Sequence, residues 1–323
     1  MFKASDLNII RDEFSKFPLV VEGASGSIGL SILKVLRDLS IRPKNLILTT
    51  NSSAISKNWQ DVSDDILHLR RLNNDFSDRL SDALWANKFN LIFAAGYGQP
   101  AKFMENPKGA IESNTDHLLF YKDYDINYLA YMSTSEIYSG INGEAFEDSQ
   151  PVSTPKDARS VYIEAKRLGE AITHNILSHS AKRHAVYRIA LAFPPQLIPG
   201  DNRVLADLVA GGKDNGCVVL NGGADYFRQY QYGPNAILKV LGSLVFGHSN
   251  LYNNSGSIYL TLGQLAKEVA EILCVPVEIT VGNEAGAPAI VNINSQRITI
   301  ESRYEASHEL SLAEYLREMV YEN

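Results

Sequence analysis

A tyrosine and a lysine stand four residues apart in the segment SVYIEAKRLGE (160–170), where the apolar pattern predicts a helix. Residues at this spacing share one face of a helix, so Tyr162 and Lys166 are expected to be neighbours. Tyrosine is a weak base because its usual pKa is about 10, and a neighbouring ammonium favours the phenolate. The pair is therefore a candidate acid–base centre, although the same spacing also occurs by chance on amphipathic helices.

A polar cluster lies where another strand is predicted to end, in MSTSEIYSG (132–140). It holds three hydroxyls and one carboxylate, on Ser133, Thr134, Ser135 and Glu136. Such residues are common at helix caps and turns, so an ordinary polar loop is one interpretation. A segment that takes part in chemistry is the other.

A glycine-rich turn, VVEGASGSIG (20–29), follows the first predicted strand and opens the first predicted helix. Glycines at these places allow a tight turn, a close approach of the backbone to a pyrophosphate and close contact of helix and strand. The free N–H groups and the positive dipole end of the helix attract an anion. In a β-α-β context this turn predicts a dinucleotide site. Its expected cofactor contacts are Gly23, Ser25, Gly26, Ser27, Ile28 and Gly29.

The end of the second predicted strand bears on which dinucleotide binds. An acidic residue there would bond the adenosine ribose of NAD and repel a 2′-phosphate. The chain has Thr50, Asn51 and Ser52 instead. Neutral hydroxyls can donate to a phosphate, so the expected cofactor is NAD(P), with NADP favoured, and a plain polar loop is the alternative. Asp75, after the third predicted strand, could accept from the adenine amino group or cap a helix.

Short apolar segments alternate with helix-length intervals over the first two thirds of the chain, which implies a parallel sheet covered on both faces. Strands are expected at 17–23, 45–50, 66–72, 89–96, 126–134 and 184–193, with helices at 26–40 and from about Tyr162. The fold class predicted is α/β, a doubly wound parallel-sheet Rossmann domain over 1–193 that also takes elements from later segments. Residues 194–323 are richer in Gly, Pro, Asn and Tyr, and they predict a smaller, mixed C-terminal substrate-binding lobe. Its expected elements are short strands at 217–220 and 257–260 and helices at 262–273 and 311–320.

These motifs together resemble the extended short-chain dehydrogenase/reductase family, the NAD-dependent epimerases and dehydratases that act on nucleotide sugars. The glycine turn matches the family's cofactor loop. The AAG at 94–96 matches the turn after its fourth strand, which implies cofactor contacts from Ala94, Ala95 and Gly96.

The same resemblance assigns roles to the candidate acid–base centre. Thr134, Tyr162 and Lys166 match the family's catalytic Ser/Thr, Tyr and Lys, and Asn114 matches a structural and active-site asparagine. The match implies that Tyr162 accepts a hydroxyl proton while a hydride moves to the nicotinamide. Thr134 would share that hydrogen bond, and Lys166 would lower the pKa of Tyr162 and hold the cofactor ribose.

The triplet Thr134-Ser135-Glu136 resembles that of 4,6-dehydratases and UDP-glucuronate decarboxylases, which makes Glu136 a candidate second acid or base. A carboxylate that faces solvent or caps a helix is the alternative. Similarity to the decarboxylases in DNRV (201–204) and FRQYQY (227–232) implies that Arg203 lies near the substrate nucleotide and that Arg228 meets its diphosphate or acts near the reacting sugar. Surface salt bridges are the alternative. Ser135 is also expected to contact substrate.

Departures from the family pattern point to a specialised substrate lobe. Leu191 and Pro194 stand where the family has an asparagine and a glycine near the substrate phosphates. The leading expectation is NAD(P)-dependent modification of a nucleotide sugar through a keto-sugar, by dehydration, decarboxylation or epimerisation. A nucleotide-sugar 4-reductase or dehydrogenase, and a non-catalytic dinucleotide-binding sensor, are the alternatives.

Composition excludes several other classes of protein. A net charge of -7 without a basic patch argues against a nucleic-acid partner. No apolar run approaches the roughly 20 residues of a membrane span, and the N-terminus lacks a signal-peptide core. Cys217 and Cys274 give no metal spacing and no disulfide framework, so a cytoplasmic protein without a structural metal is expected. By analogy with the family, a homodimer is expected, with the helices near 110–124 and 162–178 packing against their copies.

Overall fold

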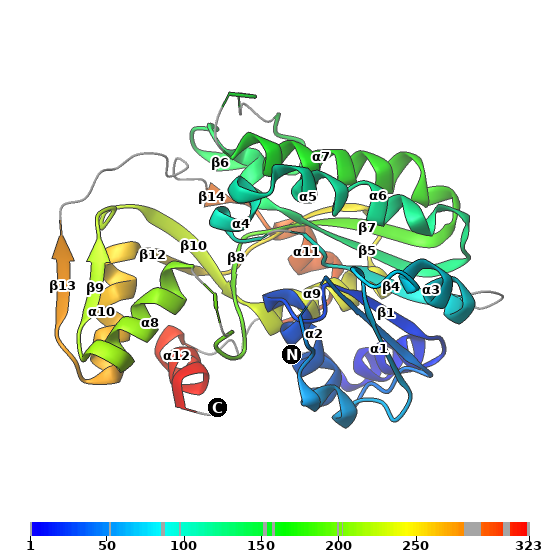
Figure 1. Cartoon of the computed structure of the whole chain (residues 1–323), viewed down its shortest axis with the longest axis horizontal. Coiled ribbons are helices and arrows are strands. Elements are labelled where there is room, and N and C mark those ends of the chain that lie inside the picture. The colour runs from blue at the N-terminus through cyan, green and yellow to red at the C-terminus, as the bar shows by residue number, and fades with distance from the viewer. Residues whose placement is uncertain are drawn as a thin grey trace.

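The structure is a computed structural model of the chain, shown in Figure 1. It describes residues 2–51, 53–84, 88–96, 98–150, 154–156, 159–198, 200–201, 203–280, 292–305 and 311–321.

A seven-stranded parallel sheet forms the centre of the larger part of the molecule. The strands are β1 (Leu19–Glu22), β2 (Leu46–Thr50), β3 (Ile66–Arg70), β4 (Phe89–Phe93), β5 (Ile126–Thr134), β7 (Ala181–Ile189) and β11 (Leu251–Asn254). Their order in the sheet is β11-β7-β5-β4-β1-β2-β3, so the winding direction reverses between β1 and β4. Ligands of such sheets bind outside the carboxyl ends of the strands at this switch point.

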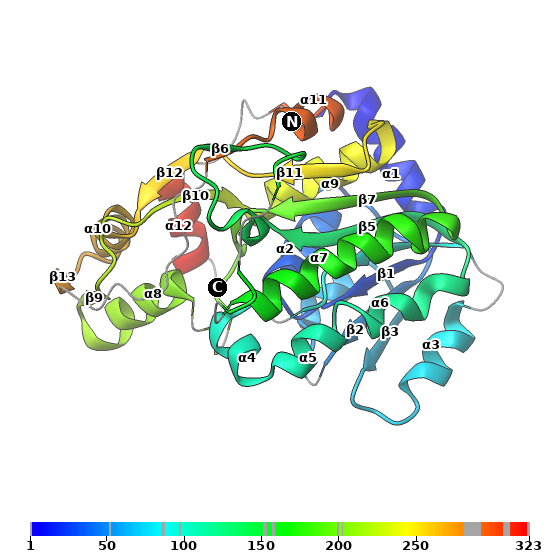
Figure 2. The same ribbon diagram turned by 90° about the horizontal axis from the view of Figure 1, so that it is seen from above.

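Helices cover both faces of the sheet, as Figures 1 and 2 show. One face carries α3 (Phe76–Leu84), α5 (Pro107–Glu112), α6 (Asp116–Leu119) and α7 (Ser160–Asn175). The other carries α1 (Ala4–Ser15), α2 (Ser27–Asp38) and α9 (Gly233–Phe246). Apolar side chains of successive strand residues therefore enter two separate cores, which is why every residue of β1, β2, β4 and β5 is buried. The predicted doubly wound parallel sheet is confirmed.

The smaller lobe is built from short strands and three helices around its own apolar core. Its strands are β8 (Leu191–Phe193), β10 (Phe227–Tyr232) and β12 (Ile258–Thr261) in one sheet, and β9 (Val218–Asn221) with β13 (Val277–Thr280) in another. Its helices are α8 (Val204–Asn215), α10 (Leu262–Leu273) and α12 (Leu312–Tyr321). Figure 1 shows this lobe on the left, beside the carboxyl ends of the parallel strands.

One predicted strand is wrong in its extent. The segment expected as a single strand at 184–193 forms β7, which stays in the parallel sheet, and β8, which pairs with β10 in the lobe. The chain leaves the sheet at Ala190 because the two strands bond to different partners. An unbroken apolar run cannot reveal such a change of sheet.

The chain returns to the large sheet after entering the lobe. Helix α9 packs against α2, and eleven of its residues are buried. Strand β11 then adds the last strand of the sheet, beside β7. The remaining elements are short: α4 (Pro100–Glu105), α11 (Gln296–Glu301), the paired β6 (Glu144–Ala145) and β14 (Asn292–Ile293), and four 3-10 turns. The Rossmann part is therefore assembled from three described stretches of chain, because Ile298 of α11 also lies in its core, and lobe elements separate these stretches.

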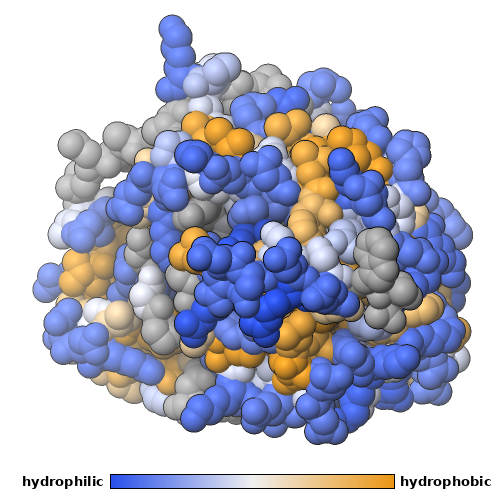
Figure 3. All heavy atoms as spheres, turned by 45° about the vertical axis from the view of Figure 1, so that its right-hand side comes forward, coloured by the Kyte–Doolittle hydropathy of each residue, from blue (hydrophilic) through white to orange (hydrophobic). Residues whose placement is uncertain are grey.

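The surface drawn in Figure 3 is mostly hydrophilic, with separate apolar areas between polar ones. On the helices expected at a dimer interface, Ile111 of α5 and Leu168 of α7 are exposed. Among the described helices, none combines the length and apolar character that crossing a bilayer requires.

Candidate functional site

The glycine turn lies between β1 and α2, at the switch point of the sheet. Gly23 has a φ of +81°, and a Cβ there would approach Ala94 O at 2.7 Å. A Cβ on Gly29 would lie 2.4 Å from Ala24 O, so any side chain would push α2 away from β1. Gly26, in an extended conformation, precedes the first residue of α2. The turn thus presents bare backbone at the start of a helix.

An unsatisfied hydroxyl supports an anionic ligand at this turn. Ser27, the first residue of α2, lines a cavity between the parallel sheet and the lobe. Its buried Oγ has no hydrogen-bond partner in the described part of the chain. The free N–H groups at the start of a helix favour a phosphate at the same place. Ser25 lies in this turn, and Ile28 lines the cavity beside Ser27. The residues present fit the pyrophosphate of a dinucleotide.

The residues expected to contact the adenosine of the cofactor lie at the end of β2 and beyond it. The Thr50 hydroxyl is 2.8 Å from Ser53 O and 3.0 Å from His68 Nε2, so it is already hydrogen-bonded inside the protein. Asn51 is exposed at the strand end, and Ser52 lies outside the described residues. Asp75 is exposed and forms an ion pair with Arg79 at 3.6 Å.

A buried carboxylate that the sequence analysis did not select lies beneath this region. Glu22, the last residue of β1, is 1% exposed and accepts hydrogen bonds from Thr49 and, at 2.6 Å, from Tyr121. Arg71, just after β3, forms an ion pair with Glu22 and lies 4.4 Å from the centroid of the Phe76 ring. The ion pair joins the end of β1 to the end of β3, and the hydrogen bond from Thr49 adds the end of β2.

A cavity of about 520 Å³ opens between the parallel sheet and the lobe. From the large sheet and its turns it is lined by predicted site residues Ser27, Ile28, Ala94, Ala95, Gly96, Thr134, Ser135, Glu136, Tyr162 and Lys166. The lobe contributes the predicted Arg203 and Arg228. The structure thus brings the cofactor turn, the polar cluster and the Tyr-Lys pair to one space.

Tyr162 is held by a hydrogen bond with Thr134 and by a stacked ring. The Phe103 ring of α4 lies parallel to the Tyr162 ring at a centroid distance of 4.7 Å. Burial, with a smaller effect of Glu136, raises the pKa of Tyr162, whereas the hydrogen bond with Thr134 lowers it. The lowered pKa expected for Tyr162 is therefore wrong for this structure, because burial outweighs the groups that lower it, and Lys166 is not among the main ones. Thr134 sets the direction of the Tyr162 hydroxyl.

Lys166 lies one helical turn beyond Tyr162, with its ammonium buried. Its Nζ donates to Met132 O at 2.7 Å and to Ala95 O at 3.3 Å. Burial lowers the pKa of Lys166 to about 7, and the charge of Glu170 acts in the opposite direction. Helix α7 comes this close to β5 because Gly169 leaves room for the Tyr131 hydroxyl, which a Cβ would meet at 2.0 Å.

Glu136 has a partner that the sequence analysis did not identify. Arg159, three residues before Tyr162, donates from Nε to Glu136 at 2.9 Å and also from Nη2. Both side chains are 24% exposed and line the cavity. The two-pronged contact fixes the Glu136 carboxyl group on the cavity wall that Tyr162 also lines. The spacing of Arg159 from Tyr162 on a helix was the signal available in the sequence.

Arg203 and Arg228 also border a second, more apolar cavity of about 430 Å³. Arg203 Nε lies 2.9 Å from Asp201, and the Arg228 guanidinium lies 5.5 Å from the centroid of the Tyr226 ring. Leu191, which replaces the family's asparagine, lines both cavities. The walls of the second cavity include Phe193, Pro194, Leu197, Ile198, Leu205, Tyr230, Leu265 and Met319.

Asn114 is fully buried and lies behind the cavity wall. Its Nδ2 donates to Ala110 O at 2.8 Å, and its Oδ1 accepts from the Tyr131 hydroxyl at 3.0 Å. A Cβ on Gly96 would lie 3.6 Å from Asn114 Oδ1 and 3.2 Å from Lys166 Nζ. Asn114 therefore holds the Tyr131 hydroxyl, and the Tyr131 ring lies 5.1 Å from Lys166 Nζ. Asn114 is not among the residues that line the cavity.

Comparison with solved structures shows the same fold in several enzymes. UDP-glucose 4-epimerase from Thermotoga maritima, solved with UDP-glucose, is 17% identical, with a TM-score of 0.73 over 94% of this chain and 97% of that one. UDP-glucuronic acid 4-epimerase from Bacillus cereus, with UDP-glucuronic acid and NAD, is 16% identical, with a TM-score of 0.74 over 94% and 98%. dTDP-glucose 4,6-dehydratase from Streptomyces venezuelae, with NAD, is 16% identical, with a TM-score of 0.75 over 93% and 96%.

Sequence comparison identifies the family, although a search of curated proteins gave no match. The model of the NAD dependent epimerase/dehydratase family matches residues 19–236, which is more than half of the chain and includes the glycine turn, the polar cluster and the Tyr-Lys pair. The resemblance inferred from the motifs is thereby confirmed. The chain belongs to the NAD dependent epimerase/dehydratase family.

Proposed function

We propose that this protein modifies a nucleotide-activated sugar through a keto-sugar, with a nicotinamide dinucleotide as cofactor. One observation carries the proposal: Thr134, Tyr162 and Lys166 line the same cavity as Ser27 at the start of α2. The similar structures named above were solved with UDP-sugars or with NAD. These similarities support the choice of substrate class.

The residues of the chain suggest how a sugar hydroxyl would be oxidised. When bound, the nicotinamide ring supplies a site that accepts a hydride and can return it. For this step Tyr162 would first release its own proton to solvent. As a phenolate, with its oxygen oriented by Thr134, it would then take the hydroxyl proton. The Lys166 ammonium would stabilise the phenolate by its charge.

Glu136 would act on the keto-sugar as the second acid or base. Its carboxyl group is held by Arg159, which fixes the direction in which it would exchange a proton with the sugar. A keto group acidifies its neighbouring C–H, and it also weakens the bond to a carboxylate on the next carbon. Dehydration, decarboxylation and epimerisation therefore all use the same first step.

The substrate nucleotide would lie towards the lobe. Arg203 and Arg228 offer guanidinium groups for a diphosphate, and the apolar second cavity offers a wall for the nucleoside. Leu191 supplies no hydrogen bond where the family has an asparagine. The proposal therefore places more of the nucleotide binding on the two arginines.

Product mass separates the possible reactions. Purified protein with cofactor would be incubated with UDP-glucuronic acid, UDP-glucose, dTDP-glucose and GDP-mannose, and the products would be analysed by mass spectrometry. We expect loss of water or carbon dioxide from one of them. Unchanged mass with a new sugar isomer would indicate epimerisation, and a change of two hydrogens would indicate a reductase or dehydrogenase. No conversion of any nucleotide sugar would contradict the proposal and favour a binding protein.

For the cofactor, we propose NAD in place of NADP. The NADP preference expected from the hydroxyls after β2 has no support from the similar structures, which were solved with NAD. The Thr50 hydroxyl is already hydrogen-bonded within the protein. We expect NAD to bind about tenfold more tightly than NADP, or about 1.4 kcal/mol, as measured by calorimetry. An acidic residue at the strand end, Asn51→Asp, should widen the difference, whereas tighter binding of NADP by the unaltered protein would overturn this choice.

A further inference from the structure

A buried carboxylate that the proposed function does not use lies one helical turn beyond Lys166. Glu170 of α7 accepts from Ser133 Oγ at 2.5 Å and from the Arg188 guanidinium at 3.0 and 2.8 Å. Both partners of this ion pair are about one-tenth exposed. A carboxylate with three donors in such a place is fixed rather than mobile.

The contacts of Glu170 connect it to the reacting groups on two sides. Ser133 directly precedes Thr134, which bonds Tyr162, so the hydrogen bond to Ser133 anchors the end of β5 where the hydroxyl cluster begins. Lys166 donates to Met132 O, the carbonyl just before Ser133. The Glu170 carboxylate is therefore hydrogen-bonded to the end of β5, and the same strand end contacts Tyr162 through Thr134 and Lys166 through Met132 O.

The charge of Glu170 also faces the catalytic lysine. Four titratable groups are influenced by this carboxylate: Lys166 and His174 on the same helix, Tyr131 on β5 and Arg188 on β7. For Lys166, burial favours the neutral amine, and Glu170 favours the ammonium. His174 has its pKa lowered by burial, so it adds little positive charge at neutral pH.

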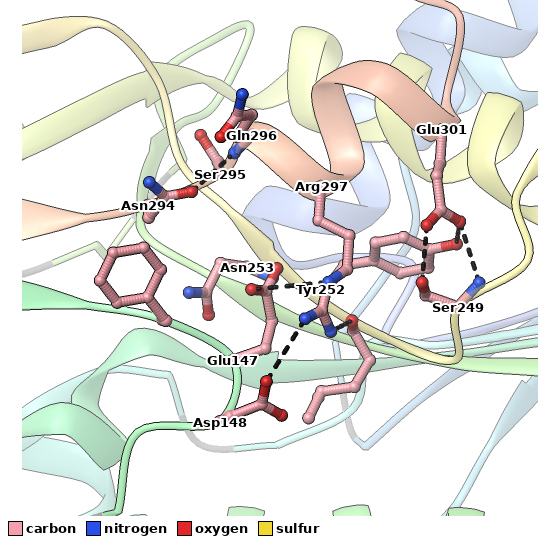
Figure 4. Close-up of polar contacts among 12 residues, drawn as sticks. Glu147, Asp148, Ser249, Tyr252, Asn253, Asn294, Ser295, Gln296, Arg297 and Glu301 are labelled. Atoms are coloured by element: carbon pink, nitrogen blue, oxygen red, sulfur yellow. Dashed lines mark hydrogen bonds and ion pairs between the residues drawn. The ribbon is translucent and has the colours of Figure 1, made fainter.

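Further polar contacts connect this ion pair to the surface. Arg188 Nη1 donates to the Tyr138 hydroxyl at 2.7 Å and to Glu147 O at 2.8 Å. Figure 4 shows the outer end, where Arg297 of α11 lies 3.8 Å from the Glu147 carboxylate and 3.5 Å from that of Asp148. Arg188 is therefore held on one side by the Glu170 carboxylate and on the other by a phenol hydroxyl and a backbone carbonyl.

We propose that Glu170 is a positioning residue of the active site, which anchors the end of β5 through Ser133 and balances the charge of the buried Lys166 ammonium. The inference rests on the proposed function for its effect on rate. Its effect on Lys166 can be measured without substrate.

The experiment compares Glu170→Gln with Glu164→Gln, which removes an exposed carboxylate of the same helix that pairs with Arg167. The 15Nζ and 13Cε signals of Lys166 would be followed against pH by NMR in the protein without cofactor, and assigned by their loss in Lys166→Arg. Removing the negative charge disfavours the ammonium, so the pKa of Lys166 should fall. We expect the midpoint to move down by about one pH unit in Glu170→Gln and to stay in place in Glu164→Gln.

The rate should follow the same direction. The active form needs a charged Lys166, which is lost as pH rises through its pKa, so the basic limb of the kcat profile should move to lower pH in Glu170→Gln. Ser133→Ala removes the hydrogen bond and keeps the charge. It should lower kcat severalfold without moving the Lys166 midpoint.

Glu170→Gln leaves the Arg188 charge unpaired and could fail to fold, so a second variant removes both charges. Glu170→Met together with Arg188→Met replaces the pair by apolar side chains, a change that proteins often tolerate. Because the positive charge of Arg188 is removed as well, the Lys166 midpoint should fall by less than in Glu170→Gln. An unchanged midpoint in a folded variant of either kind overturns the inference. A shifted midpoint in a protein that converts no nucleotide sugar would contradict the proposed function alone.

Discussion

Tyr162→Phe is expected to lower kcat by about 10²–10⁴-fold while leaving cofactor affinity within about twofold. The substitution removes one hydroxyl, and with it the proton acceptor that the proposed oxidation requires. The ring stays, so its stacking on Phe103 at 4.7 Å should hold α4 and α7 in place. The measurement pairs steady-state turnover of the nucleotide sugar with calorimetric titration of the cofactor.

Tyr124→Phe is the matched control for this substitution. It also removes one phenol hydroxyl, which lies 2.8 Å from Ser81 Oγ. Tyr124 precedes β5 and so lies at the opposite end of that strand from Thr134, and it does not line the cavity. We expect its turnover to equal that of the unaltered protein. Full activity in Tyr162→Phe would remove Tyr162 from the mechanism. Loss of cofactor binding together with turnover would assign it a structural role.

Arg71→Met is expected to lower the free energy of unfolding by about 3–5 kcal/mol. The substitution leaves the Glu22 carboxylate, which is 1% exposed, without its cationic partner. Breaking a buried pair from one side costs more than removing both charges, because the remaining charge stays out of water. Tyr121 and Thr49 would still donate to Glu22 but would not neutralise it. Urea denaturation followed by circular dichroism measures the effect.

Arg70→Met provides the comparison. Arg70 is the adjacent residue and is exposed, so its loss should change the free energy of unfolding by no more than about 0.5 kcal/mol. Equal unfolding midpoints for the two variants would show that Glu22 does not depend on Arg71. The double variant Arg71→Met with Glu22→Gln should recover part of the lost stability.

Elements with a strong local signal were predicted from sequence to within a residue or two. Strand β5 was expected at 126–134 and is found there, because its residues are apolar enough to be buried on both faces. Helix α10 was expected at 262–273 and begins and ends there, with a capping box between Thr261 and Gln264. In both cases the deciding interactions are local or require only burial.

Contacts between distant residues could not be predicted in the same way. Glu22 and Arg71 are far apart in sequence and meet only because β1 and β3 flank β2. Phe103 comes from a short helix with little periodicity, so its stacking on Tyr162 has no sequence signal of its own. The family motif identified the reacting groups, whereas the residues that hold them depend on how the strands and helices are packed.

The chain passes from the Rossmann part into the lobe and back again, so no single cut in the chain separates the two. Because β8 and β10 precede α9 and β11, a fragment that stops at residue 193 would lack the helix covering α2 and the edge strand beside β7. Such a fragment would expose an apolar sheet face and an unpaired strand edge, and both promote aggregation. Exchanging the substrate lobe for that of a relative therefore requires at least two grafted segments that flank α9 and β11, rather than a single fusion joint.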